Sequence, residues 1–493
     1  MTRHPAIHHH QQVNIMTDAP VTQVHELITY KSIDRRLDRL SEGMNIETRG
    51  PLIDALDRLS CTPFLSFPTR DGEYIRFAIG GEEAGTFCDP KVDVILKHSK
   101  PSPFGRGEET VVDVTYRCGH EVTAADITFP AEYLHKSFTS DLENSVSKTL
   151  FVARQAKVKL YKLTIYREGG HFDWHVDTTH SDSHHATILV ALNTSWTGGD
   201  FILRRNGVET RMDMKPMIEP ESPEYKPCVN LAVVAFYTDT EHKVEPITDG
   251  VRIVLQYDVE VEGWVTKKEA QDEHIHKKHK ATHLGDDDNE EGSPLDNHRT
   301  YYKERQAVLH ESVHMGDPAV IDEIVNIIER LLSDENEDAP DQVAFALQYL
   351  YRKSSIIPEY LKGSDSLLYQ ALSKTLDVSL HPVVLHERSD YEGFYQTSEA
   401  DLAAYIFPHT LDEGSNDEGS DSSDEGSRYR RWPKREERDG IFHLPHSTAI
   451  RHISRRGYVA RAGNEAILGE GKYFGGGMFV ELKDADDTED DSE

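Results

Sequence analysis

Residues 157–262 restrict the possible folds more than any other part of the chain, because short apolar runs alternate there with turn signals. The runs are rich in Val, Ile, Leu, Phe and Tyr, which is typical of strands. Asn206-Gly207 and Asp249-Gly250 favour tight hairpin turns. Gly169-Gly170 and Gly198-Gly199 mark two further turns. About seven or eight short strands at this spacing predict a jelly roll or double-sheet barrel.

A metal site is predicted inside this barrel. His175 and Asp177 are two positions apart, so in a strand both side chains lie on the same face. His242 follows a later apolar run, far enough on (242 − 177 = 65) for several strands to intervene. Two histidines and one carboxylate can hold one face of an iron(II) ion and leave positions open. The alternative is that His242 is an ordinary turn residue and His175 is structural.

An anion-binding residue is predicted on the next strand. Arg252 lies in the apolar run GVRIVLQY, where a cation is costly unless it binds an anion. Its guanidinium can hold a carboxylate of a dicarboxylic acid through paired hydrogen bonds. Tyr166, before the Gly-Gly turn, and Thr187, after the His-x-Asp pair, are candidate contacts for the same acid. The alternatives are an outward, solvated Arg252 and a Tyr166 that only fills the core.

These residues carry a family resemblance. YREGGHFDWHVD, from Tyr166 to Asp177, resembles the Tyr-x-x-Gly-Gly-x-Phe/Tyr-x-x-His-x-Asp motif of the prolyl 4-hydroxylase-like iron(II)/2-oxoglutarate-dependent dioxygenases. GGDF at 198–201 resembles the Gly-Gly corner of that family, and HKVEPITDGVRIVLQYDV resembles its distal-histidine and arginine segment. PFGRGEETVVDVTYR and GNEAILGEGKYFGGGMFVEL resemble segments of large intracellular proteins, mostly fungal, that carry this domain.

The resemblance implies a double-stranded β-helix that uses iron(II), 2-oxoglutarate and oxygen, with ascorbate as a supporting reductant. It implies His175, Asp177 and His242 as iron ligands. It also implies Arg252, where family members often have Lys, as the partner of the 2-oxoglutarate C5 carboxylate, and Tyr166 as a cosubstrate contact. The implied reaction decarboxylates 2-oxoglutarate to succinate and CO₂ and hydroxylates a C–H bond, most simply in a protein side chain such as proline. Two alternatives stay open: the same chemistry on a nucleic-acid base or small molecule, and a catalytically inactive interaction protein.

The whole chain is predicted to be α+β, with a mainly β catalytic core, flanking helices and acidic disordered linkers. Helical patterns occur in 139–156 and in three later runs, AVIDEIVNIIERLL, DQVAFALQYLYRK and SLLYQALSKTL. The predicted divisions are a disordered tail (1–22), an N-terminal extension of the barrel (23–156), the core (157–262), a polar linker (263–300), a helical region (301–410), a charged linker (411–438), a C-terminal segment (439–482) and an acidic tail (483–493).

Composition limits the environment and the partners of the chain. The net charge of −33 argues against nonspecific binding to nucleic acid or anionic membranes. The sequence contains no apolar run of membrane-spanning length. Its four cysteines have no Cys-x-x-Cys spacing, which predicts a reducing compartment, the cytoplasm or nucleus. A protein or peptide is the expected substrate, and the helical region and acidic linkers are candidate docking sites.

Overall fold

The computed structural model describes most of the chain between residues 51 and 483. The described residues are 51, 52, 54–56, 58 and 59, then 64–69, 71–152, 154–205, 208–219, 228–264, 317–333, 343–388, 401–406, 441–443, 463–466 and 473–483. The predicted tail at 1–22, the linker at 411–438 and nearly all of the linker at 263–300 and of the acidic tail lie outside these residues.

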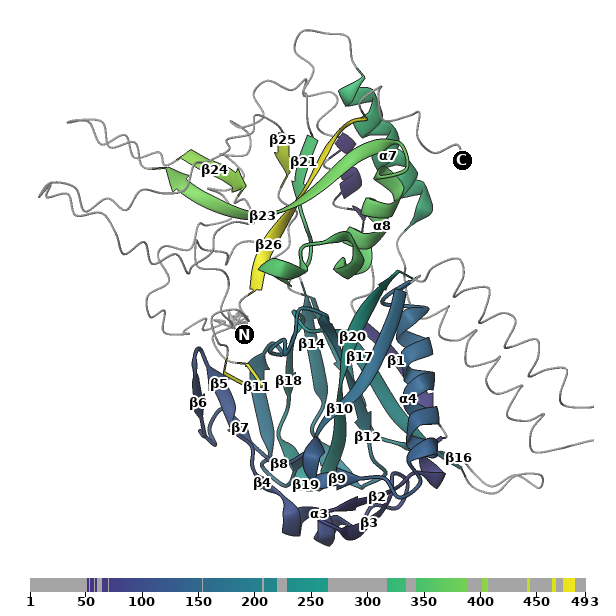
Figure 1. The fold of residues 1–493 in the computed structure, drawn as a ribbon. Helices are drawn as coiled ribbons and strands as arrows, with labels where there is room; N and C mark the ends of the chain where they lie inside the picture. The colour runs from purple at the N-terminus through teal and green to yellow at the C-terminus, as the bar shows by residue number, and fades with distance from the viewer. Residues whose placement is uncertain are drawn as a thin grey trace, which may run out of the picture.

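Two antiparallel sheets form the lower unit in Figure 1. The larger sheet has the strand order β1-β17-β12-β20-β10-β8-β4, with β16 paired to β17. Its strands are β1 (Phe64–Thr69), β4 (Lys100–Pro101), β8 (His120–Thr123), β10 (Arg154–Tyr166), β12 (His184–Ala191), β16 (Met217–Glu219), β17 (Cys228–Tyr237) and β20 (Arg252–Trp264). The smaller sheet runs β15-β14-β18-β11-β7, with β7 (Arg117–Cys118), β11 (His171–His175), β14 (Phe201–Arg205), β15 (Val208–Met212) and β18 (Glu241–Val244).

Alternation along the strands explains why the sheets pack face to face. On β20, Ile253 and Leu255 join one hydrophobic cluster, whereas Val254 joins a second cluster on the other face. The second cluster also contains Phe172 of β11 and Phe201 of β14, so it lies between the sheets. Burial of each such side chain contributes roughly 1.5–3 kcal/mol to stability.

Short elements close the ends of the two sheets. They are η1 (Asp71–Tyr74), β2 (Arg76–Ile79), β3 (Glu82–Thr86), α3 (Val92–His98), β5 (Phe104–Arg106), β6 (Glu109–Val111), η2 (Ala124–Asp126), β9 (Ile127–Thr128), β13 (Trp196–Gly198) and β19 (Ile247–Gly250). Helix α4 (Glu132–Ser147) covers the outer face of the larger sheet with Phe138, Leu142 and Val146. This helix begins and ends earlier than the predicted 139–156. It cannot extend to residue 156 because residues from Arg154 onward pair with β20.

A second unit packs above the two sheets in Figure 1. Its helices are α7 (Pro318–Leu332) and α8 (Gly363–Leu372). Its sheet has the order β24-β23-β26-β21-β25, with β22 paired to β26. The remaining elements are β21 (Val343–Ala346), β22 (Tyr351–Arg352), η3 (Lys353–Ser355), η4 (Pro358–Tyr360), β23 (Leu376–Arg388), β24 (Asp401–Ile406), β25 (Ile441–His443) and β26 (Tyr473–Leu482).

The predicted helical region is therefore only partly helical. Helix α7 begins as expected, with the Asp317 carboxylate accepting a hydrogen bond from the Ala319 backbone at 2.9 Å. The helix predicted over 341–353 is wrong, since β21 and β22 lie there. Strand β21 pairs with β25 on one side and with β26 on the other. This pairing outweighs the local helical pattern of the sequence. The C-terminal segment contributes the strand, β26, that holds this sheet together.

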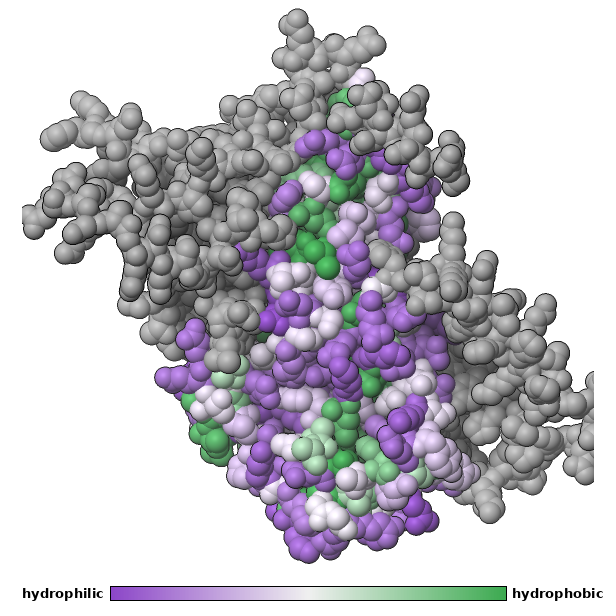
Figure 2. Space-filling model, in the orientation of Figure 1, coloured by the Kyte–Doolittle hydropathy of each residue, from purple (hydrophilic) through white to green (hydrophobic). Residues whose placement is uncertain are grey.

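The outer surface shows where polar and apolar side chains are exposed. The face in Figure 2 is mostly hydrophilic, with small groups of hydrophobic side chains visible over both units. Among the described residues, no helix is long and apolar enough to cross a membrane.

Candidate active site

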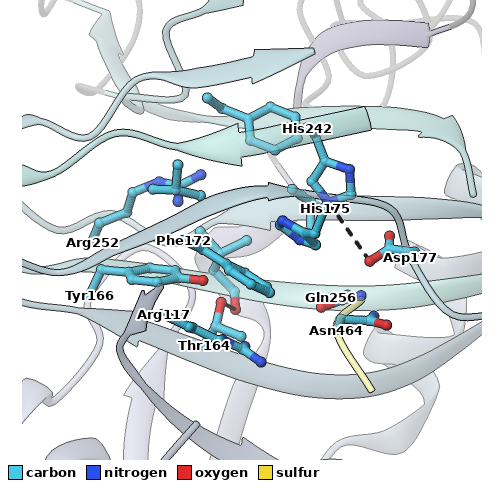
Figure 3. Close-up of a pocket in the computed structure, with 14 residues that line it drawn as sticks. Arg117, Thr164, Tyr166, Phe172, His175, Asp177, His242, Arg252, Gln256 and Asn464 are labelled. Carbon is cyan, nitrogen blue, oxygen red and sulfur yellow. Dashed lines mark hydrogen bonds and ion pairs between the residues drawn. The ribbon is translucent and has the colours of Figure 1, made fainter. Parts of the chain in front are cut away.

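Two neighbouring strands of the smaller sheet bring the three predicted metal ligands together. His175 ends β11 and His242 lies in β18, where the two residues are partners in the antiparallel register. Asp177 follows two residues after His175, and its Oδ1 lies 3.7 Å from His242 Nε2. One ligand atom from each of the three residues lies within 4.8 Å of the other two, and all three side chains are buried (Figure 3). A single metal ion fits this group of donors.

Both imidazoles are held in the tautomer that a metal requires. His175 Nδ1 donates to the Asp173 carbonyl at 2.7 Å, and His242 Nδ1 donates to the Thr240 carbonyl at 2.9 Å. Because a carbonyl can only accept, the proton of each neutral ring lies on Nδ1 and the Nε2 lone pair is free to bind a metal. Burial, together with nearby His242, lowers the pKa of His175 well below its usual range, so the ring is neutral.

Arg252 lies in the same cavity. Its side chain is only 1% exposed, and its Nε and Nη2 atoms have no hydrogen-bond partner among the described residues. Burial lowers the pKa of Arg252 to about 10, against an opposing effect of Tyr166, so the group stays charged at neutral pH. A buried guanidinium without an anion is costly, and a bound carboxylate would remove that cost. Tyr166 borders the cavity beside it, with its ring centre 5.8 Å from the Arg252 guanidinium carbon.

Comparison with protein families identifies this part of the chain. Residues 161–257 match the family model for the 2OG-Fe(II) oxygenase superfamily. Residues 161–257 are a 2OG-Fe(II) oxygenase domain. The oxygenase family predicted from the sequence motif is thereby confirmed, and membership of this superfamily implies iron(II) and 2-oxoglutarate. Comparison with curated protein sequences found no match.

Several solved structures are similar to part of the chain. A prolyl-4-hydroxylase from Pseudomonas putida is 18% identical, with 30% of this chain and 75% of that chain covered and a TM-score of 0.22. A Trichoplax adhaerens prolyl hydroxylase in complex with a hypoxia-inducible-factor peptide is 17% identical, covering 32% and 70%, with a TM-score of 0.22. A viral collagen prolyl hydroxylase from Paramecium Bursaria Chlorella virus-1, bound to 2-oxoglutarate, is 15% identical, covering 39% and 98%, with a TM-score of 0.21.

A second group of metal-type side chains lies near the oxygenase site, but its nitrogen atoms already have partners. The group is His180, His184 and Asp258. His184 accepts from the His180 backbone through Nδ1 at 3.2 Å and donates to the Ala186 carbonyl through Nε2 at 3.1 Å. His180 faces Asp258 through Nδ1 at 2.6 Å and Glu465 through Nε2 at 3.4 Å. These contacts describe an ion-pair cluster, so the first group is the better candidate for a metal site.

Four polar residues that the sequence did not indicate also line the oxygenase cavity: Arg117, Thr164, Gln256 and Asn464. Gln256 could have been found, because it lies four positions after Arg252 on β20 and so faces the same way. Arg117 stacks on the Phe172 ring at 4.4 Å and lies 3.7 Å from the Glu121 carboxylate. Asn464 lies in the segment GNEAILGEGKYFGGGMFVEL, which carried a family resemblance, but no local pattern placed that segment at this cavity.

Thr187 has a different contact from the one expected. Its hydroxyl donates to Asp177 Oδ2 at 2.5 Å, and it is not among the residues that line the cavity. The predicted contact with the cosubstrate stays a prediction. The observed hydrogen bond orients the Asp177 carboxylate so that its other oxygen atom, Oδ1, faces His242.

A Thr187→Val variant tests this positioning. We expect the affinity for iron(II) to fall by roughly 10- to 100-fold, as is typical when the outer partner of a metal ligand is lost. Thr187→Ser keeps the hydroxyl and should bind iron(II) nearly as the wild type does. Competition titration against a chelator measures both affinities, and equal affinity for Thr187→Val and wild type would contradict the assignment.

Proposed function

We propose that the protein is an iron(II)- and 2-oxoglutarate-dependent dioxygenase that hydroxylates a C–H bond of a protein side chain, with proline as the first candidate. One observation carries the proposal. A cluster of two histidines and a carboxylate shares a cavity with a buried guanidinium, two of whose nitrogen atoms have no hydrogen-bond partner among the described residues. A metal ion and a carboxylate-bearing ligand would complete both sets of donors.

Each residue has a distinct role in this proposal. His175, Asp177 and His242 would hold iron(II), which when bound would supply the oxidative chemistry that converts 2-oxoglutarate, oxygen and a substrate C–H group to succinate, CO₂ and the hydroxylated substrate. Arg252 would bind the C5 carboxylate, and Tyr166 would contact the same ligand. The apolar side chains Phe172, Phe201 and Val254 would exclude water around the reacting groups.

The proposed fold of the domain is a double-stranded β-helix. Support comes from two facing antiparallel sheets with the donors between them. A protein substrate is favoured by the motif YREGGHFDWHVD, which resembles that of enzymes acting on prolyl residues. Because related folds host different substrates, proline is the first class to test and does not follow from the fold.

Succinate formation tests the proposed chemistry. Purified protein would be incubated with iron(II), ascorbate, oxygen and 2-oxoglutarate, and the wild type compared with His175→Ala. We expect succinate from the wild type only. A library of proline-containing peptides, screened by mass spectrometry for the gain of one oxygen atom, then tests the substrate class. Failure of the wild type both to form succinate and to bind 2-oxoglutarate in the presence of manganese(II) would contradict the proposed function.

A further inference from the structure

Residues 463–466, GNEA, lie against the metal-binding loop although they are far away in the sequence. Gly463 forms a parallel bridge with Val176, the residue between His175 and Asp177. The Thr178 backbone N–H donates to Asn464 Oδ1 at 2.8 Å, across 286 positions of sequence. The Thr178 hydroxyl donates to the Glu465 carbonyl at 2.9 Å. This segment therefore forms one wall of the site.

Close backbone contact fixes the segment on its other side. Gly105 of β5 and Gly463 exchange two hydrogen bonds, both 3.0 Å long. A Cβ atom at Gly105 would lie only 1.8 Å from the Glu465 carbonyl oxygen, so any other residue there would displace the segment. Glycine at position 105 lets the backbone of residues 463–466 approach closely.

An ion pair further anchors the segment to the larger sheet. The Glu465 carboxylate accepts from the Tyr161 hydroxyl and lies 3.4 Å from His180 Nε2. Although burial acts to lower the pKa of His180, its hydrogen bonds to Asp258 and Glu465 raise that pKa to about 10. Burial acts to raise the pKa of Glu465, but His180 and Tyr161 lower it to about 2. Both groups are therefore charged at neutral pH.

Asn464 directs an unused donor into this cavity. The contact with the Thr178 N–H identifies Oδ1 as the acceptor, which leaves the amide nitrogen as the other end of the side chain. That Nδ2 atom is buried and has no hydrogen-bond partner among the described residues. Asn464 is 3% exposed and lines the cavity together with His175 and Asp177. Figure 3 shows Asn464 and Arg252 on opposite sides of His175.

We propose that Asn464 is a cosubstrate-binding residue whose amide donates to the C1 carboxylate of 2-oxoglutarate. The inference rests on the proposed function. If Arg252 holds one carboxylate of this extended diacid, the other carboxylate lies at the metal end, beside Asp177 and Asn464. A carboxylate has two oxygen atoms, and one that does not bind the metal needs a donor in a buried cavity. The Asn464 amide is such a donor.

Two variants separate this role from a structural one. Asn464→Ala removes the donor and should weaken 2-oxoglutarate binding roughly tenfold or more, the scale of one hydrogen bond to a charged group. Asn464→Asp keeps the shape and can still accept from the Thr178 N–H, but it places a second negative charge at the C1 carboxylate. We therefore expect Asn464→Asp to bind 2-oxoglutarate more weakly than Asn464→Ala.

Calorimetric titration of the full-length, manganese(II)-loaded protein with 2-oxoglutarate measures these affinities without turnover. Asn193→Ala, which removes an asparagine side chain bound to the Cys88 carbonyl outside the cavity, should bind as the wild type does. Wild-type affinity in both Asn464 variants would overturn the inference and leave the proposed function intact. Near-normal binding of 2-oxoglutarate by Asn464→Asp would also overturn the inference, because an aspartate beside the C1 carboxylate would repel it. This outcome is decisive even if Asn464→Ala does not fold. No binding by the wild type would overturn the proposed function itself.

Discussion

An Asp177→Ala variant is expected to lose iron-dependent succinate formation and to bind iron(II) more than about a hundredfold more weakly. This loss is larger than the roughly 10- to 100-fold loss expected when a residue that only hydrogen-bonds a metal ligand is removed. The reason is that Asp177 is the single carboxylate in the cluster with His175 and His242. Two neutral imidazoles alone supply no negative charge to offset a divalent cation. Chelator competition measures the affinity, and succinate quantification measures the turnover.

The second His/Asp group provides the matched control. Asp258→Asn changes one atom of the cluster with His180 and His184, where the imidazole nitrogens already have partners. This variant should still bind iron(II). If Asp258→Asn lost iron(II) while Asp177→Ala kept it, the metal would belong to the second group and the assignment made here would be wrong. Circular dichroism would show that both variants are folded.

Local sequence pattern was sufficient to locate the donors of the first group. His175 and Asp177 share a face because of strand periodicity, and His242 meets them because β11 and β18 are adjacent in the smaller sheet. The position of Arg252 also followed from pattern, since an arginine within an apolar run needs a buried partner. The structure brings these residues to one cavity, and their placement could be predicted because it depends on neighbours within one strand or on one strand pairing.

The remaining cavity residues depend on long-range contacts. Asn464 reaches the site only because Gly463 pairs with Gly105 and Val176, a contact between segments hundreds of residues apart that periodicity cannot reveal. The same limit explains the helix wrongly predicted over 341–353, where pairing with β26 overrides the local pattern. Thr187 lies beside Asp177, but sequence could not show that its hydroxyl would donate to that carboxylate.

The second unit also supports the site in a way that sequence did not indicate. Asp239, three residues before His242, forms a buried ion pair with Lys362 at 2.9 Å. It also accepts a hydrogen bond from the Leu350 backbone at 3.0 Å and lies 3.3 Å from Arg205. These contacts hold the turn that leads into β18 and so help to orient the distal histidine. The second unit therefore contacts the segment that immediately precedes β18.

An Arg252→Met variant is expected to weaken 2-oxoglutarate binding severely while leaving the ligand-free protein at least as stable as the wild type. Loss of one partner from a buried charge pair costs about 2–5 kcal/mol of binding free energy, which is roughly 30- to 5,000-fold in affinity. Methionine occupies similar space without the charge. Replacing even paired buried charges by apolar residues of similar volume is often neutral or stabilises a fold by about 1–4 kcal/mol.

Thermal unfolding with and without 2-oxoglutarate, in the presence of manganese(II), tests both parts of this prediction. At a ligand concentration one hundred times the dissociation constant, binding should stabilise the wild type by about 2.7 kcal/mol, and Arg252→Met should show no such increase. Arg252→Lys keeps a cation but loses the paired geometry, so it should retain part of the increase. A ligand-free Arg252→Met protein that unfolds at a much lower temperature would mean that the guanidinium has a structural partner. If the melting temperature of ligand-free Arg252→Met does not fall, the Arg252 charge does not stabilise the ligand-free fold. That result is expected if the partner of the guanidinium is the carboxylate of the bound ligand.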